Sequence, residues 1–192
     1  LHLSSGEVLL VSDLLIAAGR VPNIEQLALE RAGVEYSEFG VIVDRKLRTT
    51  NRSVYAIGDI VEGSRFTHTA SYHAGIVLKK ILLGLPSKLR TDHIPQVTYT
   101  DPEIASVGMN FEDAVKRFGK KVERSFVNLK TNDRAITDSK TEGFVEVILL
   151  GRKVIGCSIT SKNAGELISF WAFIIAKCIK ISGLASLYIF IT

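Results

Sequence analysis

The segment Val54–Asp59 contains the residue types that a ligand-binding turn needs. Val54–Ile57 is a short uncharged apolar run, which predicts a strand buried on both faces of an α/β sheet. Gly58 has no Cβ, so the backbone can turn there and approach a ligand closely. Asp59 would then stand at the carboxyl end of the strand, where open α/β sheets bind ligands and where a carboxylate could hold neighbouring hydroxyl groups. The alternative is a buried strand that ends in a solvated turn aspartate.

Two further motifs flank this segment. Ala17–Asn23 reads Ala-Ala-Gly-Arg-Val-Pro-Asn, and Val97–Gly108 reads Val-Thr-Tyr-Thr-Asp-Pro-Glu-Ile-Ala-Ser-Val-Gly. With the Val-Tyr-Ala-Ile-Gly-Asp run between them, the chain resembles the class I, FAD-linked pyridine nucleotide-disulfide oxidoreductases. That family includes dihydrolipoamide dehydrogenase, glutathione reductase and mercuric reductase. Asn132–Ala135 and Thr141–Phe144 favour the mercuric reductase and dihydrolipoamide dehydrogenase side of the family.

The resemblance implies a set of cofactor-binding residues. It implies FAD and, in the intact enzyme, NAD(P)H as cofactors, with Asp59 after Gly58 accepting hydrogen bonds from the ribityl chain of FAD. It also implies that Thr67, His68 and Ala70 begin a helix at the pyrimidine edge of the flavin. Unpaired backbone N–H groups and the positive end of the helix dipole would stabilise negative charge on the reduced ring there.

Several family motifs do not occur in this sequence. Family members carry a Gly-rich FAD fingerprint, a Cys-x4-Cys redox pair and a Gly-rich nicotinamide fingerprint, and none of these is found here. We therefore interpret the chain as the C-terminal part of a longer protein, whose N-terminal half is supplied in cis or in trans. The acid–base His and Glu of the His-Pro-Thr-x-Ser-Glu segment are also absent, since no histidine follows His93. We predict no catalytic residue in this chain.

The end of the chain departs from the family pattern as well. Leu184–Thr192 is an apolar run that carries Tyr188, which lies loosely beside the tyrosine-bearing segment of mercuric reductase-like relatives. The cysteine pair that ends those relatives is missing. An exposed apolar run of this kind invites aggregation, so we expect a truncated or frame-shifted end.

The remaining candidates for chemistry have simpler interpretations. Cys157 and Cys178 are too far apart for a metal cluster or a Cys-x-x-Cys site, and their apolar surroundings predict two buried free thiols. His68 and His73 have no third ligand near them in sequence, so we expect no metal site. In Thr100–Glu103, Pro102 fixes a turn, and the acidic residues are expected to serve as turn and cap residues.

The fold class predicted is α/β, formed by the ends of nicotinamide and FAD Rossmann-like domains, followed by an α+β dimerisation domain with an antiparallel sheet. Residues 1–18 would end the nicotinamide-binding domain, residues 19–90 would form the C-terminal part of the FAD-binding domain, and residues 94–192 would form the dimerisation domain. In the first two parts we expect strands at Glu7–Val11, Asp13–Ala18, 41–43 and Val54–Ile57, a helix near 25–32, and a helix from about Thr67 to Leu83 that Gly84 stops.

The third part has a regular alternation of elements. Strands are expected at Gln96–Tyr99, Ile104–Val107, Val122–Leu129, Gly143–Leu150 and Lys153–Thr160, with a tight turn at Gly151-Arg152 and a short helix that Asn110 caps. A last helix, Ala164–Lys177, carries one apolar stripe: Leu167, Ile168, Trp171, Ala172 and Ile175. This stripe is expected either to pack in the core or to face a second subunit of a homodimer.

Composition narrows the function classes. A chain of 192 residues with 46% hydrophobic and 23% charged residues can bury a core. The net charge of +4 comes from basic residues spread along the chain, so no nucleic-acid partner is expected. Phe170–Ala176 is too short to span a bilayer and no signal peptide is visible, which predicts a cytoplasmic protein without a membrane partner.

Two hypotheses of function follow. The chain is the C-terminal portion of an FAD-dependent NAD(P)H:disulfide or mercuric-ion oxidoreductase, in which hydride passes from nicotinamide via flavin to a cysteine pair, and it is inactive alone. Alternatively, it is a catalytically inactive dimerisation or partner-binding module derived from such an enzyme.

Overall fold

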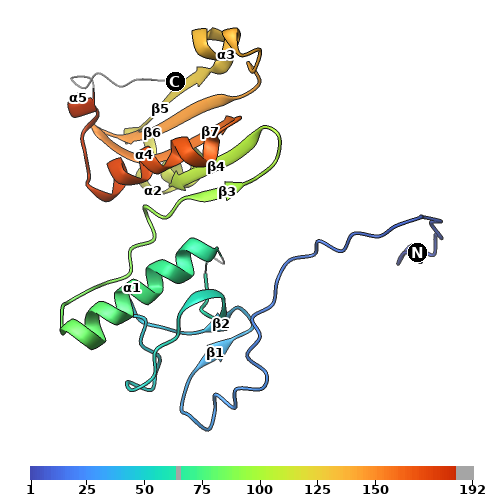
Figure 1. Ribbon diagram of the computed structural model, residues 1–192, viewed down its shortest axis with the longest axis vertical. Helices are drawn as coiled ribbons and strands as arrows, with labels where there is room; N and C mark the ends of the chain where they lie inside the picture. Colours follow the sequence, from blue (N-terminus) through green and yellow to red (C-terminus); the bar gives the residue numbers. More distant parts are fainter. Residues whose placement is uncertain (64–65, 185–192) are drawn as a thin grey trace.

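The computed structural model describes residues 1–63 and 66–184, which form two units joined by a linker of residues 84–95 (Figure 1). The second unit is built on a five-stranded antiparallel sheet in the order β3-β4-β7-β6-β5. Its strands are β3 (Gln96–Thr98), β4 (Glu103–Gly108), β5 (Val122–Asn128), β6 (Phe144–Leu150) and β7 (Lys153–Ser161). These five strands confirm the strands predicted in this part of the chain, and β4 shows the alternation of a sheet with one face covered, since Ala105 and Val107 are buried.

A tight turn joins β6 to β7. Leu150 pairs with Lys153, so Gly151 and Arg152 alone form the loop, and Gly151 has φ +60°. A glycine takes this left-handed conformation at little cost, which explains why the Gly-Arg pair predicted the turn correctly.

The two longest helices of this unit are capped by nearby side chains. In α2 (Phe111–Phe118), Asn110 Oδ1 accepts from the backbone N–H of Asp113 at 2.8 Å, which confirms the predicted cap. At the start of α4 (Ala164–Ala176), Glu103 Oε2 accepts from the Gly165 N–H at 2.9 Å. The cap assignment of Glu103 is therefore confirmed. The shorter elements are η2 (Gly119–Lys121), η3 (Leu129–Thr131), α3 (Asp133–Thr137) and α5 (Ile181–Leu184).

The core of this unit lies between α4 and one face of the sheet. Ile168 and Ile174 are fully buried, and Trp171 and Ala172 pack against the same cluster. Core packing therefore accounts for most of the predicted stripe. Leu167, in contrast, is 42% exposed. Some apolar side chains of α4 are thus buried in the core, and others are partly exposed. Figure 1 shows the helix lying across the sheet.

The first unit is dominated by α1 (Thr67–Leu83), whose bounds match the prediction. Gly84 follows with φ +64°, the left-handed conformation in which glycine commonly ends a helix. A two-stranded sheet, β1 (Tyr36–Ser37) and β2 (Gly40–Val41), and the 3-10 turn η1 (Gly58–Ile60) complete it. The strand expected at 41–43 is therefore shorter than predicted.

Two other predicted elements of this unit are wrong. The helix at 25–32 is replaced by turns, since Ala28 has φ +46°, which a right-handed helix cannot contain. Val54–Ile57 forms no strand: only Tyr55 pairs, in a single bridge with Arg48, and Ile57 is 39% exposed. Backbone groups there bond to the preceding loop instead, as when the Ala56 N–H donates to the Leu47 carbonyl.

The predicted strands at Glu7–Val11 and Asp13–Ala18 are also wrong. Residues 1–18 are extended and exposed, and their one bridge pairs His2 with Val8 (Figure 1). Leu10 is 96% and Leu15 88% exposed. A strand needs a neighbouring strand to accept and donate its hydrogen bonds, and among the described residues this segment has only the short contact between residues 1–3 and 7–9.

The linker is fixed to both units by polar contacts. Arg90 donates through Nη2 to Asp92 at 2.7 Å and through Nη1 to the Ala176 carbonyl at the end of α4, at 3.0 Å. The Arg90 guanidinium holds the pKa of the Asp92 carboxyl below its usual range. On the other side, His68 Nε2 lies 2.7 Å from the Pro95 carbonyl oxygen. The linker is thus bound to α1 and to α4.

Candidate functional site

The turn at Gly58 brings the predicted site residues to the start of α1. Gly58 is buried with φ +74°, and the Val61 N–H donates to its carbonyl at 3.1 Å. A Cβ at Gly58 would lie 3.4 Å from the Cβ of Ala70, which is ordinary contact, so the left-handed backbone rather than lack of space requires glycine. Gly58 and Ala70, distant in sequence, are therefore neighbours.

Asp59 presents its carboxylate beside this turn. It lies within η1, not at the end of a strand as predicted, and its side chain is 39% exposed. Its Oδ2 is 2.8 Å from the Nη2 of Arg20, whose side chain is 68% exposed. Arg20 belongs to the Ala-Ala-Gly-Arg-Val-Pro-Asn motif, so the ion pair brings two of the sequence motifs together. An ion pair this exposed orients the carboxylate but contributes about 0–1 kcal/mol to stability.

The first turn of α1 carries the other predicted residues. Thr67 and His68 are exposed, Ala70 is partly buried, and no acidic side chain occurs in this turn. The positive end of the helix dipole is therefore not neutralised from within the helix. The His68 ring points to the linker, where it contacts Pro95, and stacks on Phe66 with centroids 5.4 Å apart. Only its backbone remains to serve a ligand beside Gly58.

Two residues of α1 were not among the predicted site residues. His73 is buried, and its Nδ1 accepts a hydrogen bond from the Gly58 N–H at 3.2 Å. Burial lowers the pKa of the His73 imidazole, in agreement with an acceptor nitrogen on a neutral ring. Thr69 Oγ1 is buried without a hydrogen-bond partner among the described residues. The sequence carries no signal for the His73 contact or for the burial of Thr69, because both depend on how α1 packs on the turn.

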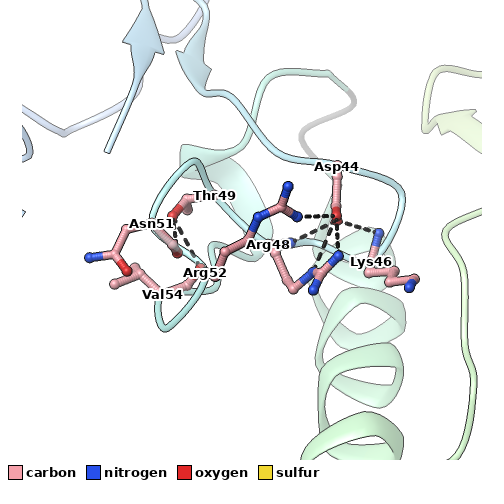
Figure 2. Close-up of polar contacts among 7 residues, drawn as sticks. All are labelled: Asp44, Lys46, Arg48, Thr49, Asn51, Arg52 and Val54. Atoms are coloured by element: carbon pink, nitrogen blue, oxygen red, sulfur yellow. Dashed lines mark hydrogen bonds and ion pairs between the residues drawn. The ribbon is translucent and has the colours of Figure 1, made fainter. Parts of the chain in front are cut away.

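The loop that leads into this turn is organised around Asp44 (Figure 2). Its carboxylate accepts from the backbone N–H groups of Lys46 at 2.7 Å and Arg48 at 3.1 Å, and it pairs with the guanidinium groups of Arg48 and Arg52. Burial opposes ionisation of Asp44, but the hydrogen bonds from Arg48 and Lys46 outweigh it and hold the pKa of the carboxyl below its usual value. The Asp-Arg-Lys-Leu-Arg run could have suggested this turn.

A buried hydroxyl closes the same loop. Thr49 Oγ1 donates to the Asn51 carbonyl at 2.9 Å or to that of Val54 at 3.1 Å. Figure 2 draws these residues. Side-chain hydrogen bonds, instead of a sheet, therefore hold the backbone of the loop that leads into Val54–Ile57.

The cysteines lie far from this turn in the second unit. Cys157 is 1% exposed, and burial raises the pKa of its thiol to about 12. Cys178 is exposed, so the prediction of two buried thiols is right for Cys157 and wrong for Cys178. Cys178 follows the end of α4. In the described ranges, no three His, Cys, Asp or Glu side chains gather as metal ligands would.

The tail from Ala185 to Thr192, with Tyr188, lies outside the residues described, so the expectation of a truncated end stays a prediction. No helix within residues 1–63 and 66–184 is long and apolar enough to cross a membrane.

Two family models match the chain in sequence order. Residues 1–74 match the pyridine nucleotide-disulphide oxidoreductase model, and residues 94–191 match the pyridine nucleotide-disulphide oxidoreductase dimerisation domain. The chain therefore belongs to the pyridine nucleotide-disulphide oxidoreductase family, whose members use FAD and NAD(P)H. The family resemblance and the fold class are confirmed.

Characterised relatives fall on the predicted side of the family. The chain is 35% identical to mercuric reductase of Bacillus cereus over 158 residues, covering 81% of the chain and 25% of that enzyme. It is also 35% identical to dihydrolipoyl dehydrogenase of Bacillus subtilis (strain 168), covering 81% of the chain and 33% of the enzyme. The chain thus spans a quarter to a third of the length of these relatives.

Solved structures give the same result. LpdA from Mycobacterium tuberculosis superimposes with a TM-score of 0.89 at 27% identity, covering 98% of this chain and 42% of LpdA. The HOCl-induced flavoprotein disulfide reductase RclA from Escherichia coli has a TM-score of 0.77 at 25% identity, covering 91% of this chain and 41% of RclA. Similarity extends over both units of the fold.

Proposed function

We propose that this chain is the C-terminal portion of an FAD- and NAD(P)H-dependent disulfide or mercuric-ion oxidoreductase. The observation that carries the proposal is the pair of family matches, in order, over residues 1–74 and 94–191. When bound, FAD supplies the ring that accepts hydride from nicotinamide and passes the electrons to a cysteine pair. The nicotinamide-binding domain would then end with residues 1–18. The FAD-binding domain would end with residues 19–90, and the dimerisation domain would comprise residues 94–192.

The residues proposed to hold FAD are Gly58, Asp59, Thr67, His68 and Ala70. Three observations fit that group. The Asp59 carboxylate is accessible and has oxygens that can accept from ribityl hydroxyls. Ala70 is small and lies beside the Gly58 turn. The first turn of α1 lacks acidic side chains, so its backbone N–H groups and dipole favour electron-rich atoms.

The chain alone is proposed to be inactive. Of the two cysteines, Cys157 is buried with a thiol that resists ionisation, and Cys178 is an exposed free thiol. Thiolate is the reactive form in disulfide chemistry, so a thiol that stays protonated, as in Cys157, does not suit a redox pair. The cysteine pair and the nicotinamide fingerprint would come from an N-terminal portion, in cis or in trans.

A homodimer is the proposed assembly. Leu167, Phe170 and Phe173 on α4 are 42%, 40% and 54% exposed, and Tyr99 on the β3–β4 connection is 81% exposed. Exposed aromatic and aliphatic side chains of this kind are typical of an interface that a second subunit covers. We propose a cytoplasmic location, with neither nucleic acid nor membrane as a partner.

A second candidate is a catalytically inactive dimerisation or partner-binding module. It is favoured by the core of the second unit, in which α4 and the sheet bury Ile168, Ile174 and Ile159 without help from the first unit. Such a unit could persist after the catalytic parts were lost.

One experiment separates the two candidates. The chain is produced alone and together with its upstream reading frame, and NAD(P)H oxidation is measured with Hg(II) and with disulfide acceptors. The oxidoreductase proposal expects turnover only when the upstream portion is present. An upstream region without a Cys-x4-Cys pair, combined with absence of turnover in both preparations, would favour the inactive module.

A further inference from the structure

The backbone N–H of Gly58 has an unusual acceptor. It is buried, and it donates to the Nδ1 of His73, at 3.2 Å, across the contact between η1 and α1. A buried N–H group requires an acceptor, and no backbone carbonyl is bonded to this one among the described residues. The strand expected at Val54–Ile57 does not form. A side chain of α1 therefore supplies the hydrogen-bond acceptor that a neighbouring strand would otherwise supply.

The imidazole is suited to this role in only one state. Nδ1 can accept a hydrogen bond only when it carries no proton, so the ring is neutral with its proton on Nε2. His73 is 4% exposed, and burial lowers its pKa, so the neutral form is the stable one. The other backbone group of Gly58, its carbonyl, is held by the Val61 N–H at 3.1 Å. Both polar groups of the turn are therefore fixed.

From this geometry we propose that His73 is the positioning residue of the turn that presents Asp59 to FAD. The inference rests on the proposed function for its ligand. His73 fixes the backbone from inside the fold, whereas Arg20 pairs with the Asp59 carboxylate at the surface, where water screens the interaction. Of the two contacts, the buried hydrogen bond therefore has the larger effect on the position of the turn. His73 itself touches no cofactor.

The test compares side chains that differ in where they place an acceptor. His73→Asn puts a carbonyl oxygen near the position of Nδ1, His73→Gln puts one a methylene further out, and His73→Leu removes the acceptor. Hydrogen–deuterium exchange of the Gly58 amide is followed by NMR in the 192-residue chain. We expect exchange to be about 10-fold faster or more in His73→Leu and near the wild-type rate in His73→Asn.

The outcomes decide the proposal in either direction. Wild-type exchange rates in His73→Leu would overturn it, as would equal rates in His73→Asn and His73→Gln. The second comparison remains decisive if the leucine variant does not fold. The exchange readout needs no flavin, so it is independent of the proposed function.

A second readout addresses the cofactor. In the protein that includes the upstream portion, His73→Gln should raise the dissociation constant for FAD about 10-fold, while His73→Asn leaves it within about 2-fold. Equal dissociation constants in these two variants would overturn the positioning role. A wild-type protein that binds no FAD would instead refute the proposed function and leave the exchange result standing.

Discussion

Two adjacent residues of α4 offer a matched test of how that helix is oriented. Ile168 is 0% exposed and packs against the sheet, whereas Leu167 is 42% exposed. The side chains are isomers, so replacement by alanine removes the same atoms from each. Ile168→Ala should lower the free energy of unfolding by about 2–5 kcal/mol, because burial is lost and a cavity remains. Leu167→Ala should cost less than about 1 kcal/mol, since much of its surface already contacts water.

Urea denaturation, followed by circular dichroism at low protein concentration, measures both values. The denaturant slope should be equal in the two variants, so that the midpoints can be compared directly. Light scattering on the same samples tests the other half of the account: Leu167→Ala should weaken association of two chains more than Ile168→Ala does. Equal losses of stability, or a loss below about 1 kcal/mol for Ile168→Ala, would refute the assignment of α4's buried face.

Three further predictions concern single side chains. Burial lowers the pKa of His73 in the folded chain below 6.5, so at acidic pH the unfolded chain binds a proton that the folded chain does not. Stability should therefore fall as pH drops below 6.5. His73→Asn should flatten that decline in thermal melts at several pH values. A thiol reagent should modify only Cys178 in the native chain and also Cys157 in denaturant, and modification of both in the native chain would contradict the burial. Gly156→Ala should destabilise the chain by at least about 1–3 kcal/mol, because the new Cβ would lie 1.8 Å from the Met109 carbonyl oxygen. Gly75 in α1 has nothing within 4 Å of a Cβ position, so Gly75→Ala should stabilise the chain by about 0.5–1 kcal/mol. Calorimetry measures both changes.

The sequence predicted the second unit well because its signals are local. Alternating apolar residues, the Gly151-Arg152 turn and the Asn110 cap each act over a few residues, so pattern alone determines the strands and the short helix. The α1 bounds were equally accessible, because Gly84 ends that helix by a local rule.

The first unit was harder because its structure depends on distant contacts. Val54–Ile57 has the composition of a strand, yet its backbone bonds to the preceding loop, which Asp44 and Thr49 hold. No local sequence feature distinguishes a strand from a segment that bonds to the preceding loop. The contact of His73 with Gly58 was missed for the same reason: a buried histidine on a helix has no signature until the packing of that helix is known.

Flavin content of the chain with and without its proposed N-terminal portion tests the central claim most directly. The chain is produced alone and joined to its upstream reading frame, in wild-type form and as Asp59→Ala, and the flavin absorbance per chain is measured after purification. The account predicts a colourless 192-residue chain, one bound flavin per chain in the joined protein, and a clear loss of flavin in Asp59→Ala. A joined wild-type protein that purifies without flavin, or an Asp59→Ala variant that retains it fully, would contradict the account.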